Sequence, residues 1–172
     1  LRDNQWRGPV EVPETSGDLW WPQVGVDARG RTWVVWSQQV DGNFDLYARP
    51  FHNDRWGATV RLTDSPLPDI NPAMAQDSEG SLYVVWQGWR GQKSGIHLRS
   101  LRNGGWQPEV RVSESASNDW FPQVSACKQP GSIWITWDSY RNDNYDVYAR
   151  GYNGRLGEEL AVTSSPLYEA DA

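Results

Sequence analysis

Two short acidic segments of the chain have the residue types and spacing of a calcium-binding loop. Asp41, Asn43 and Asp45 place side-chain oxygen atoms at alternate positions, and Ca²⁺ takes oxygen ligands from carboxylates, amides and carbonyls. The matching residues of the second segment are Asn142, Asn144 and Asp146. Residues 92–95 lack the pattern, and Asn, Asp and Gly are common in tight hairpin turns. We therefore expect plain hairpins and no cofactor, with calcium as the alternative.

A second set of residues has the chemistry of a ligand-binding surface. Trp89 lies outside the positions at which tryptophan recurs in this chain, and Arg90 follows it directly. Rings provide stacking surfaces for a sugar or a peptide, while charged and amide groups orient the ligand. The candidate ligand-binding residues are Trp89, Arg90, Tyr140, Arg141, Trp21 and Asp138.

The acidic residues do not single out a catalytic pair. Glycoside hydrolysis needs two carboxyl groups on either side of the scissile bond, and several acids lie in loops or at strand ends. Asp69 and Asp119 recur at one position of the sequence, which favours turn capping. Asp138 is more distinctive, because Ser37 and Gln87 stand at its place in the other copies. We predict no catalytic residue, and the question of an enzyme stays open, with binding favoured.

These residues belong to a repeat that organises the chain. Residues 22–49 return as 72–99 and again as 122–150, a period of about 50 residues. In each copy a glycine precedes an aromatic residue by three positions and a tryptophan by six. The glycines are Gly30, Gly80 and Gly131, and the tryptophans are Trp36, Trp86 and Trp137. A repeat of this length is typical of solenoids, arrays and propellers.

Each copy has the pattern of four short β-strands. In the first copy they are predicted near 22–27, 31–38, 44–51 and 56–63, from alternation, aromatic and β-branched residues, and intervening turns. The second strand reads TWVVW, LYVVW and IWITW in the three copies, so it is apolar on both faces and needs cover on both. This pattern predicts an all-β fold: a β-propeller of four-stranded antiparallel blades, whose first strands line a central channel.

The predicted organisation is a single β-propeller region over 1–172. Its repeats run approximately over 15–63, 64–113 and 114–163, and 1–14 is expected to be the outer strand of a preceding blade. About three blades plus one outer strand fall short of the roughly four to eight blades of a closed propeller. We expect further blades in a longer parent chain, or, as the less favoured alternative, a self-associated copy that completes the ring.

Several motifs recur in the copies: W-x-x-x-V-x-V/L-S/T, an Asp and a Gly in the first turn, W-x-x-W, and D-x-Y-x-R. Together they resemble the propeller repeats of bacterial TolB-like and sialidase-like (BNR-type) proteins. Asp27 stands one residue further from Gly30 than the acid of a sialidase Asp-box does, and Lys128 replaces the acid in the third copy. The resemblance implies a periplasmic or extracellular protein. It implies no particular activity, because this fold hosts many functions.

Composition limits the partners. The net charge is -6 and the pI about 4.9, which disfavours nucleic acid, since phosphates require a basic surface. No apolar run approaches the roughly 20 residues of a membrane helix, so no membrane insertion is expected. Cys127 is the sole cysteine and falls in a predicted strand, where we expect it to behave as a small buried hydrophobe.

Several repeated residues are expected to serve packing rather than chemistry. Trp20 and Trp120 share one repeat position, and His97 takes the place of a tyrosine at another. A third position, in the third strand of each copy, holds an arginine that is expected to pair with a carboxylate of a neighbouring blade. These arginines are Arg49, Arg99 and Arg150.

The functional face of this propeller is expected to be the one where its loops meet. The loops between blades are 16–22, 65–72 and 115–122, and those joining second and third strands are 38–45, 88–95 and 139–146. We predict a non-catalytic binding or scaffolding module that recognises a carbohydrate or protein partner there. The alternatives are part of a sialidase-like or related glycoside hydrolase, and a half-propeller that self-assembles into a closed ring.

Overall fold

The computed structural model describes residues 8–13, 15 and 17–170, and these residues form three antiparallel sheets and no helix. Accordingly, this part of the chain contains no helix long and apolar enough to cross a membrane. The first sheet contains β1 (Leu19–Val26), β2 (Thr32–Val40), β3 (Asn43–His52), β4 (Arg55–Trp56) and β5 (Val60–Arg61). The second contains β6 (Asp69–Gln76), β7 (Leu82–Trp89), β8 (Ser94–Arg102), β9 (Gly105–Trp106) and β10 (Val110–Arg111). The third contains β11 (Asp119–Ala126), β12 (Ile133–Arg141), β13 (Asn144–Tyr152) and β14 (Leu156–Ala161).

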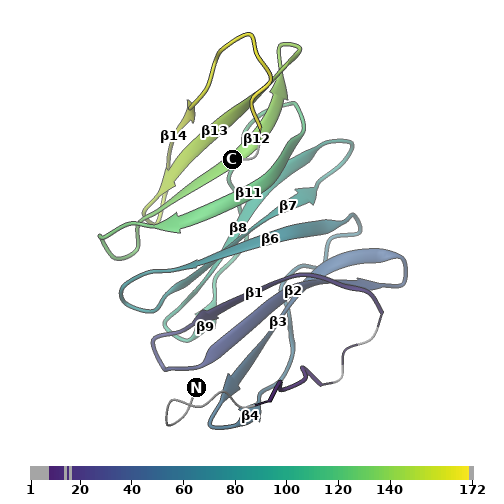
Figure 1. Cartoon of the computed structure of the whole chain (residues 1–172), viewed down its shortest axis with the longest axis vertical. Coiled ribbons are helices and arrows are strands. Elements are labelled where there is room, and N and C mark those ends of the chain that lie inside the picture. The colour runs from purple at the N-terminus through teal and green to yellow at the C-terminus, as the bar shows by residue number, and fades with distance from the viewer. Residues whose placement is uncertain (1–7, 14, 16, 171–172) are drawn as a thin grey trace.

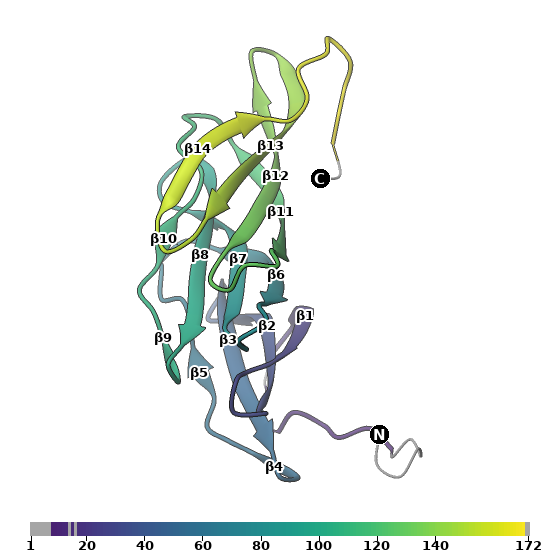
Figure 2. The ribbon, with the colours of Figure 1, turned by 90° about the vertical axis from the view of Figure 1, so that its left-hand side faces the viewer.

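The sheets follow one another along the molecule as blades of a partial β-propeller. The first strands β1, β6 and β11 lie side by side (Figure 1). In the turned view they follow one edge, while β5, β10 and β14 follow the other (Figure 2). This confirms the predicted four-stranded antiparallel blades. The fourth strand is interrupted in the first two blades, as β4 with β5 and β9 with β10, and continuous in the third as β14.

The hydrophobic core consists of two clusters, one on each face of the second blade. Leu82, Val84 and Trp86 of β7 pack with Trp33 and residues near it in the first blade. The alternate residues of β7 turn to the opposite face and pack against Ile135 and Trp137 of the third blade. Every residue from 82 to 88 is buried, which confirms for the second blade that the second strand is covered on both faces; in the third blade Trp134 of β12 is exposed.

A stacked ring pair recurs in each blade and links its second and third strands. The pairs are Trp36–Tyr47, Trp86–His97 and Trp137–Tyr148, with ring centroids 6.3, 5.7 and 6.3 Å apart. His97 is 1% exposed, so its predicted packing role is confirmed.

The repeated arginines hold neighbouring blades together mainly through backbone carbonyls. Arg99 donates from Nε to the carbonyl of Gln107 (2.7 Å) in its own blade and from a terminal nitrogen to the carbonyl of Leu62 in the preceding one. Arg150 repeats this arrangement with Gly157 and Val112, and adds a 2.9 Å ion pair to Glu114. The prediction that Arg99 pairs with a carboxylate of a neighbouring blade is therefore wrong. Its guanidinium group donates to two backbone carbonyls, which satisfy its N–H groups equally well.

The first blade uses its arginine in the same way. Arg49 donates to the carbonyl of Gly57 (2.8 Å) and to that of Pro13, which is one residue beyond Val12, the repeat counterpart of Leu62. The outer strand predicted over 1–14 lies partly outside the described residues, at 1–7 and 14, and residues 8–13 form no strand.

An aspartate organises the first turn of the first two blades. The Asp77 carboxylate accepts hydrogen bonds from the Tyr83 hydroxyl (3.1 Å) and, across the blade interface, from the Gly131 backbone N–H (3.0 Å). Burial opposes the charge, but these hydrogen bonds outweigh it and lower the pKa of Asp77. Burial and the neighbouring Asp77 raise the pKa of Tyr83 to about 12. Asp27 and Trp33 form the corresponding pair in the first blade, at 2.9 Å.

In the third blade the place of this aspartate is taken by Cys127. Its backbone N–H donates to the carbonyl of Ser132 (2.9 Å), as that of Asp27 does to Arg31 (2.9 Å). Two predictions are thus wrong: the residue that replaces the acid is Cys127 rather than Lys128, and Cys127 is a partly exposed turn residue after β11. This turn has one residue more than the turns of the first two blades, so counting back from Gly131 by the spacing between Asp27 and Gly30 gives Lys128 instead of Cys127.

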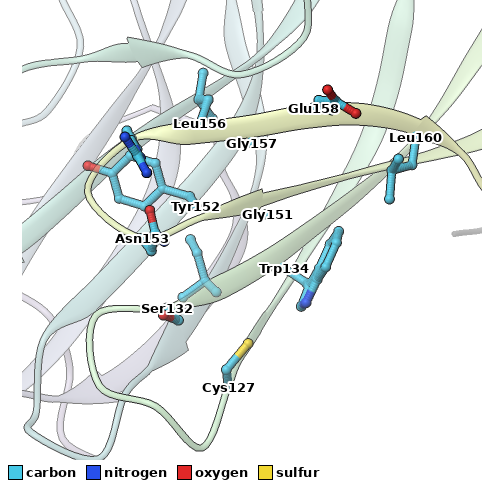
Figure 3. Close-up of a pocket in the computed structure, with 12 residues that line it drawn as sticks. Cys127, Ser132, Trp134, Gly151, Tyr152, Asn153, Leu156, Gly157, Glu158 and Leu160 are labelled. Carbon is cyan, nitrogen blue, oxygen red and sulfur yellow. The ribbon is translucent and has the colours of Figure 1, made fainter.

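The outward face of the third blade is apolar and open. Trp134 is 45% exposed, whereas Trp33 and Tyr83, at the same repeat position, are 4% and 0% exposed because the next blade covers them. A hollow of about 490 Å³ lies on this face, lined by Cys127, Trp134 and Leu160 among others (Figure 3). The opposite end of the molecule exposes Val24 by 68% and Val26 by 40%.

Candidate functional site

The loops expected to meet on one face do so. The Asn43 side chain, at the start of β3, donates to the carbonyl of Ser65 (2.9 Å), and the Trp89 backbone N–H donates to the carbonyl of Pro68 (3.1 Å). The third blade repeats the first contact, from Asn144 to the carbonyl of Ser165 (2.7 Å). We call this surface the loop face.

An apolar pocket of about 310 Å³ lies on the loop face between the first two blades. We call it the aromatic pocket, and its lining residues are Trp20, Trp21, Phe44, Pro68, Ile70 and Trp89. Trp20 and Trp21 have ring centroids 5.5 Å apart with planes tilted by 39°. They are 47% and 42% exposed. The packing role predicted for Trp20 is therefore wrong, because its ring opens onto this pocket.

A β-bulge presents Trp21 to this pocket. The pairing of β1 with β2 shifts register between Trp20 and Gln23, and Trp21 has a φ of +50°. Bulges of this kind redirect side chains, and a bulky residue at positive φ is an outlier. The same bulge in the third blade holds Phe121 at +47°, while the second blade has Asn71 at +53°, a residue that tolerates this conformation.

A buried carboxylate lies beside the aromatic pocket. Asp69 is 0% exposed and its Oδ1 accepts hydrogen bonds from Nε1 of Trp86 (2.8 Å) and from Arg90 (2.9 Å). Gly88 leaves room for this carboxylate, since a Cβ there would collide with Oδ1 of Asp69. Burial raises the pKa of Asp69, and the positive charge of Arg90 opposes that rise. A buried charge requires such a partner, and Arg90 also donates to the backbone carbonyl of Trp89 (2.8 Å).

Glu109 completes the arrangement from the outer edge of the second blade. Its oxygens lie 2.9 Å from Arg90 and 2.9 Å from Nδ1 of His97. Burial raises the pKa of Glu109, but hydrogen bonds from His97 and Arg90 outweigh burial and lower that pKa to about 2.

This low pKa makes the stability of the fold acid-sensitive. The pKa of Glu109 is about 2 in the folded protein against 4.5 when unperturbed. Its ionised form therefore stabilises the fold above about pH 4.5, and this contribution is lost as the pH falls toward about 2. Glu109→Gln removes the titrating group. Between about pH 6 and about pH 3, the melting temperature of the wild type should fall further than that of the variant, as followed by circular dichroism. Parallel curves would contradict the assignment.

The third blade contains a related arrangement around Arg141. Its guanidinium pairs with Glu159, lies 3.5 Å from buried Asp119, and stacks 3.7 Å above the ring of Tyr148. Both predicted ligand-binding arginines are thus engaged with carboxylates of the protein. Tyr140 is 40% exposed on the loop face, whereas Asp138 is 3% exposed and lies on β12 opposite Trp120.

The calcium-like segments form the expected hairpin turns. Asp41 and Asn142 have positive φ values of 52° and 53°, as residues of tight hairpins do. The Asp45 carboxylate is 2% exposed and pairs with Arg61 at 2.6 Å. The described residues contain no group of three or more His, Cys, Asp or Glu side chains placed to hold a metal ion.

No protein-family model matches the chain, and no curated protein does. Solved structures do. A thermostable family-43 glycoside hydrolase is 14% identical with a TM-score of 0.60, and the match covers 90% of this chain and 57% of that one. TolB from Acinetobacter baumannii is 17% identical with a TM-score of 0.53, covering 86% and 33%. A fucose lectin from Kordia zhangzhouensis, in complex with methyl-fucoside, is 16% identical with a TM-score of 0.52, covering 85% and 98%.

These similarities establish the propeller fold. The chain spans just over half the length of the family-43 hydrolase and a third of TolB. The TolB-like part of the sequence resemblance agrees with them, while the sialidase-like part stays a prediction.

Sequence reasoning found two residues of the aromatic pocket, Trp21 and Trp89, and missed Trp20 and Phe44. Trp20 was missed because the bulge brings both adjacent indole rings into one pocket, whereas a regular strand would point them to opposite faces.

Proposed function

We propose that this protein is a non-catalytic carbohydrate-binding module of a periplasmic or extracellular protein, and that the aromatic pocket is its binding site. The observation that carries the proposal is Trp21, a large aromatic residue held at a φ of +50° and 42% exposed. Strained backbone of this kind persists where the surrounding structure enforces it, and it is concentrated at functional sites.

The chemistry of the pocket suits a neutral sugar. Its volume of about 310 Å³ matches a small ligand, and its exposed indole rings provide flat apolar surfaces for the C–H face of a sugar ring. The side chains of Asn43 and Arg90, adjacent to Phe44 and Trp89 in sequence, are engaged by the Ser65 carbonyl and by Asp69 and Glu109, so the pocket itself offers apolar contact. The net charge of -6 disfavours a polyanionic ligand. A protein partner that inserts an apolar side chain is the alternative occupant.

Glycoside hydrolysis is the alternative function, and the family-43 hydrolase among the structural matches motivates it. Two of its candidate acids are used within the fold: Asp69 accepts hydrogen bonds from Trp86 and Arg90, and Asp119 accepts one from Ser139. We therefore favour binding. Release of reducing sugar from arabinan or xylan by the purified chain would reverse this preference.

Replacement of Trp89 tests the proposal. Affinity electrophoresis in gels containing arabinan, xylan or xyloglucan should show retardation of the wild type by at least one polysaccharide. Trp89→Ala should be retarded less, with its melting temperature nearly unchanged, because the half-buried Trp89 ring lines the pocket and belongs to neither core cluster.

Trp56→Ala is the matched control for this experiment. Trp56 is also half-buried, but it lies in β4, at the end of β3 remote from the loop face. Its variant should migrate like the wild type. Equal retardation of Trp89→Ala and wild type would refute a role for the pocket.

A half-propeller that self-assembles is supported by the open outward face of the third blade. We propose that this face packs against the first blade of a second copy. That blade exposes Val24, whereas Val124, at the same repeat position, packs against the preceding blade. Light scattering should then give twice the chain mass of 19.6 kDa. A monomer would exclude self-association and leave the face to further blades of a longer chain.

A further inference from the structure

The third blade contains a second aromatic cluster on the loop face. The Tyr145 ring is at its centre, with centroids 5.5 Å from Trp120, 4.7 Å from Tyr140 and 4.8 Å from Tyr168. Tyr140 and Tyr168 are 40% and 70% exposed, and the neighbouring Phe121 is 55% exposed. We call these five residues the third-blade cluster.

The cluster repeats four of the six lining positions of the aromatic pocket two blades further along the chain, while Ile70 and Trp89 reach that pocket from the second blade. The corresponding pairs are Trp20 and Trp120, Trp21 and Phe121, Phe44 and Tyr145, and Pro68 and Tyr168. In the intermediate repeat the same positions hold Ile70, Asn71, Ser94 and Asn118.

The first and third repeats thus have aromatic residues at positions where the second repeat has none, and this difference separates binding from packing. The second blade is covered on both faces and contains the most completely buried strand, β7, yet it lacks the aromatic residues at these positions. Blade packing therefore does not require them. The bulge also indicates that packing does not require Phe121. Phe121 is held at a φ of +47°, whereas Asn71 adopts the same conformation in the second blade with less strain.

We infer that the third-blade cluster is a second carbohydrate-binding site, so that one chain binds a polysaccharide at two points. The inference rests on the proposed function of the aromatic pocket. Stacked Trp120 and Tyr145, with planes 28° apart, offer an apolar platform. Tyr140, Tyr145 and Tyr168 add hydroxyl groups, which both donate and accept and which the lining of the aromatic pocket lacks. The second site therefore takes a neutral sugar unit with more polar contact to its hydroxyls.

Two sites on one rigid chain bind a polymer by avidity, which exceeds either single affinity by about 100-fold or more. Trp21→Asn and Phe121→Asn are matched variants, because each introduces the residue that the second blade has at the same bulge. The probe is whichever of arabinan, xylan and xyloglucan retards the wild type most in affinity electrophoresis. Each single variant should bind about 100-fold more weakly, and the double variant should migrate as in a gel without polysaccharide.

The outcomes distinguish the two proposals. If Phe121→Asn is retarded like the wild type while Trp21→Asn is not retarded, the second site is overturned and the first stands. If no polysaccharide retards the wild type, the proposed function fails and the second site with it. Tyr168→Ala provides an independent variant, since a side chain that is 70% exposed can be truncated without unfolding the blade. It should weaken binding in the same direction as Phe121→Asn.

Discussion

Replacing Trp86 by alanine is expected to lower the free energy of unfolding by about 3–5 kcal/mol. Trp86 is 0% exposed and packs between the first two blades. Its indole N–H donates to the buried Asp69 carboxylate at 2.8 Å, and its ring stacks on His97. The variant therefore creates a cavity and removes one hydrogen bond from a buried charge, and both effects destabilise the fold.

Urea denaturation followed by circular dichroism measures this loss. Trp56→Ala is the control, because Trp56 is only half-buried and belongs to neither core cluster, and the free energy lost by this variant should be clearly smaller. A decrease under about 1 kcal/mol for Trp86→Ala would contradict the core assignment, since truncation of a fully buried tryptophan costs more than that.

Trp21→Asn should separate binding from stability. Loss of an aromatic side chain at the centre of a binding site costs about 2 kcal/mol or more, so we expect polysaccharide affinity to fall at least about 30-fold. Stability should not fall with it. Asn tolerates the left-handed conformation that costs other L-residues about 1–2 kcal/mol, and Trp21 is 42% exposed with a φ of +50°.

The free energy of unfolding of Trp21→Asn should thus equal or exceed that of the wild type by up to about 1 kcal/mol. Affinity electrophoresis and urea denaturation on the same preparations provide both values. A variant that loses stability and retains affinity would show that Trp21 is a packing residue. That result would refute the proposed site.

The sequence was sufficient to predict the repeat, the four-stranded blades and the meeting of the loops. These features depend on local patterns: a glycine at fixed distance before Trp36 and its counterparts, and second strands apolar on both faces. Strand β1 begins at Leu19 rather than 22, because the bulge lets pairing continue past Trp20 and Trp21.

The aromatic pocket was only partly predictable, because the bulge that forms it leaves no clear pattern. A shift of one residue moves side chains to the opposite face of a strand, so the exposure of Trp20 depended on a register that the sequence alone does not reveal. The turn of the third blade was misaligned for a similar reason, since one inserted residue brought Cys127 into the place of Asp77. The carbonyl partners of Arg99 were not predictable either, because every residue has a carbonyl.

The central claim, that the aromatic pocket binds carbohydrate, is tested most directly by NMR of the twelve tryptophan indole N–H groups. They would be recorded on ¹⁵N-labelled protein during titration with oligosaccharides prepared from the retarding polysaccharide. Signals of Trp20, Trp21 and Trp89 should shift in a saturable way, while those of core residues such as Trp33 and Trp86 stay in place. Saturable shifts that leave these three signals unchanged, or no shifts at all, would contradict the account.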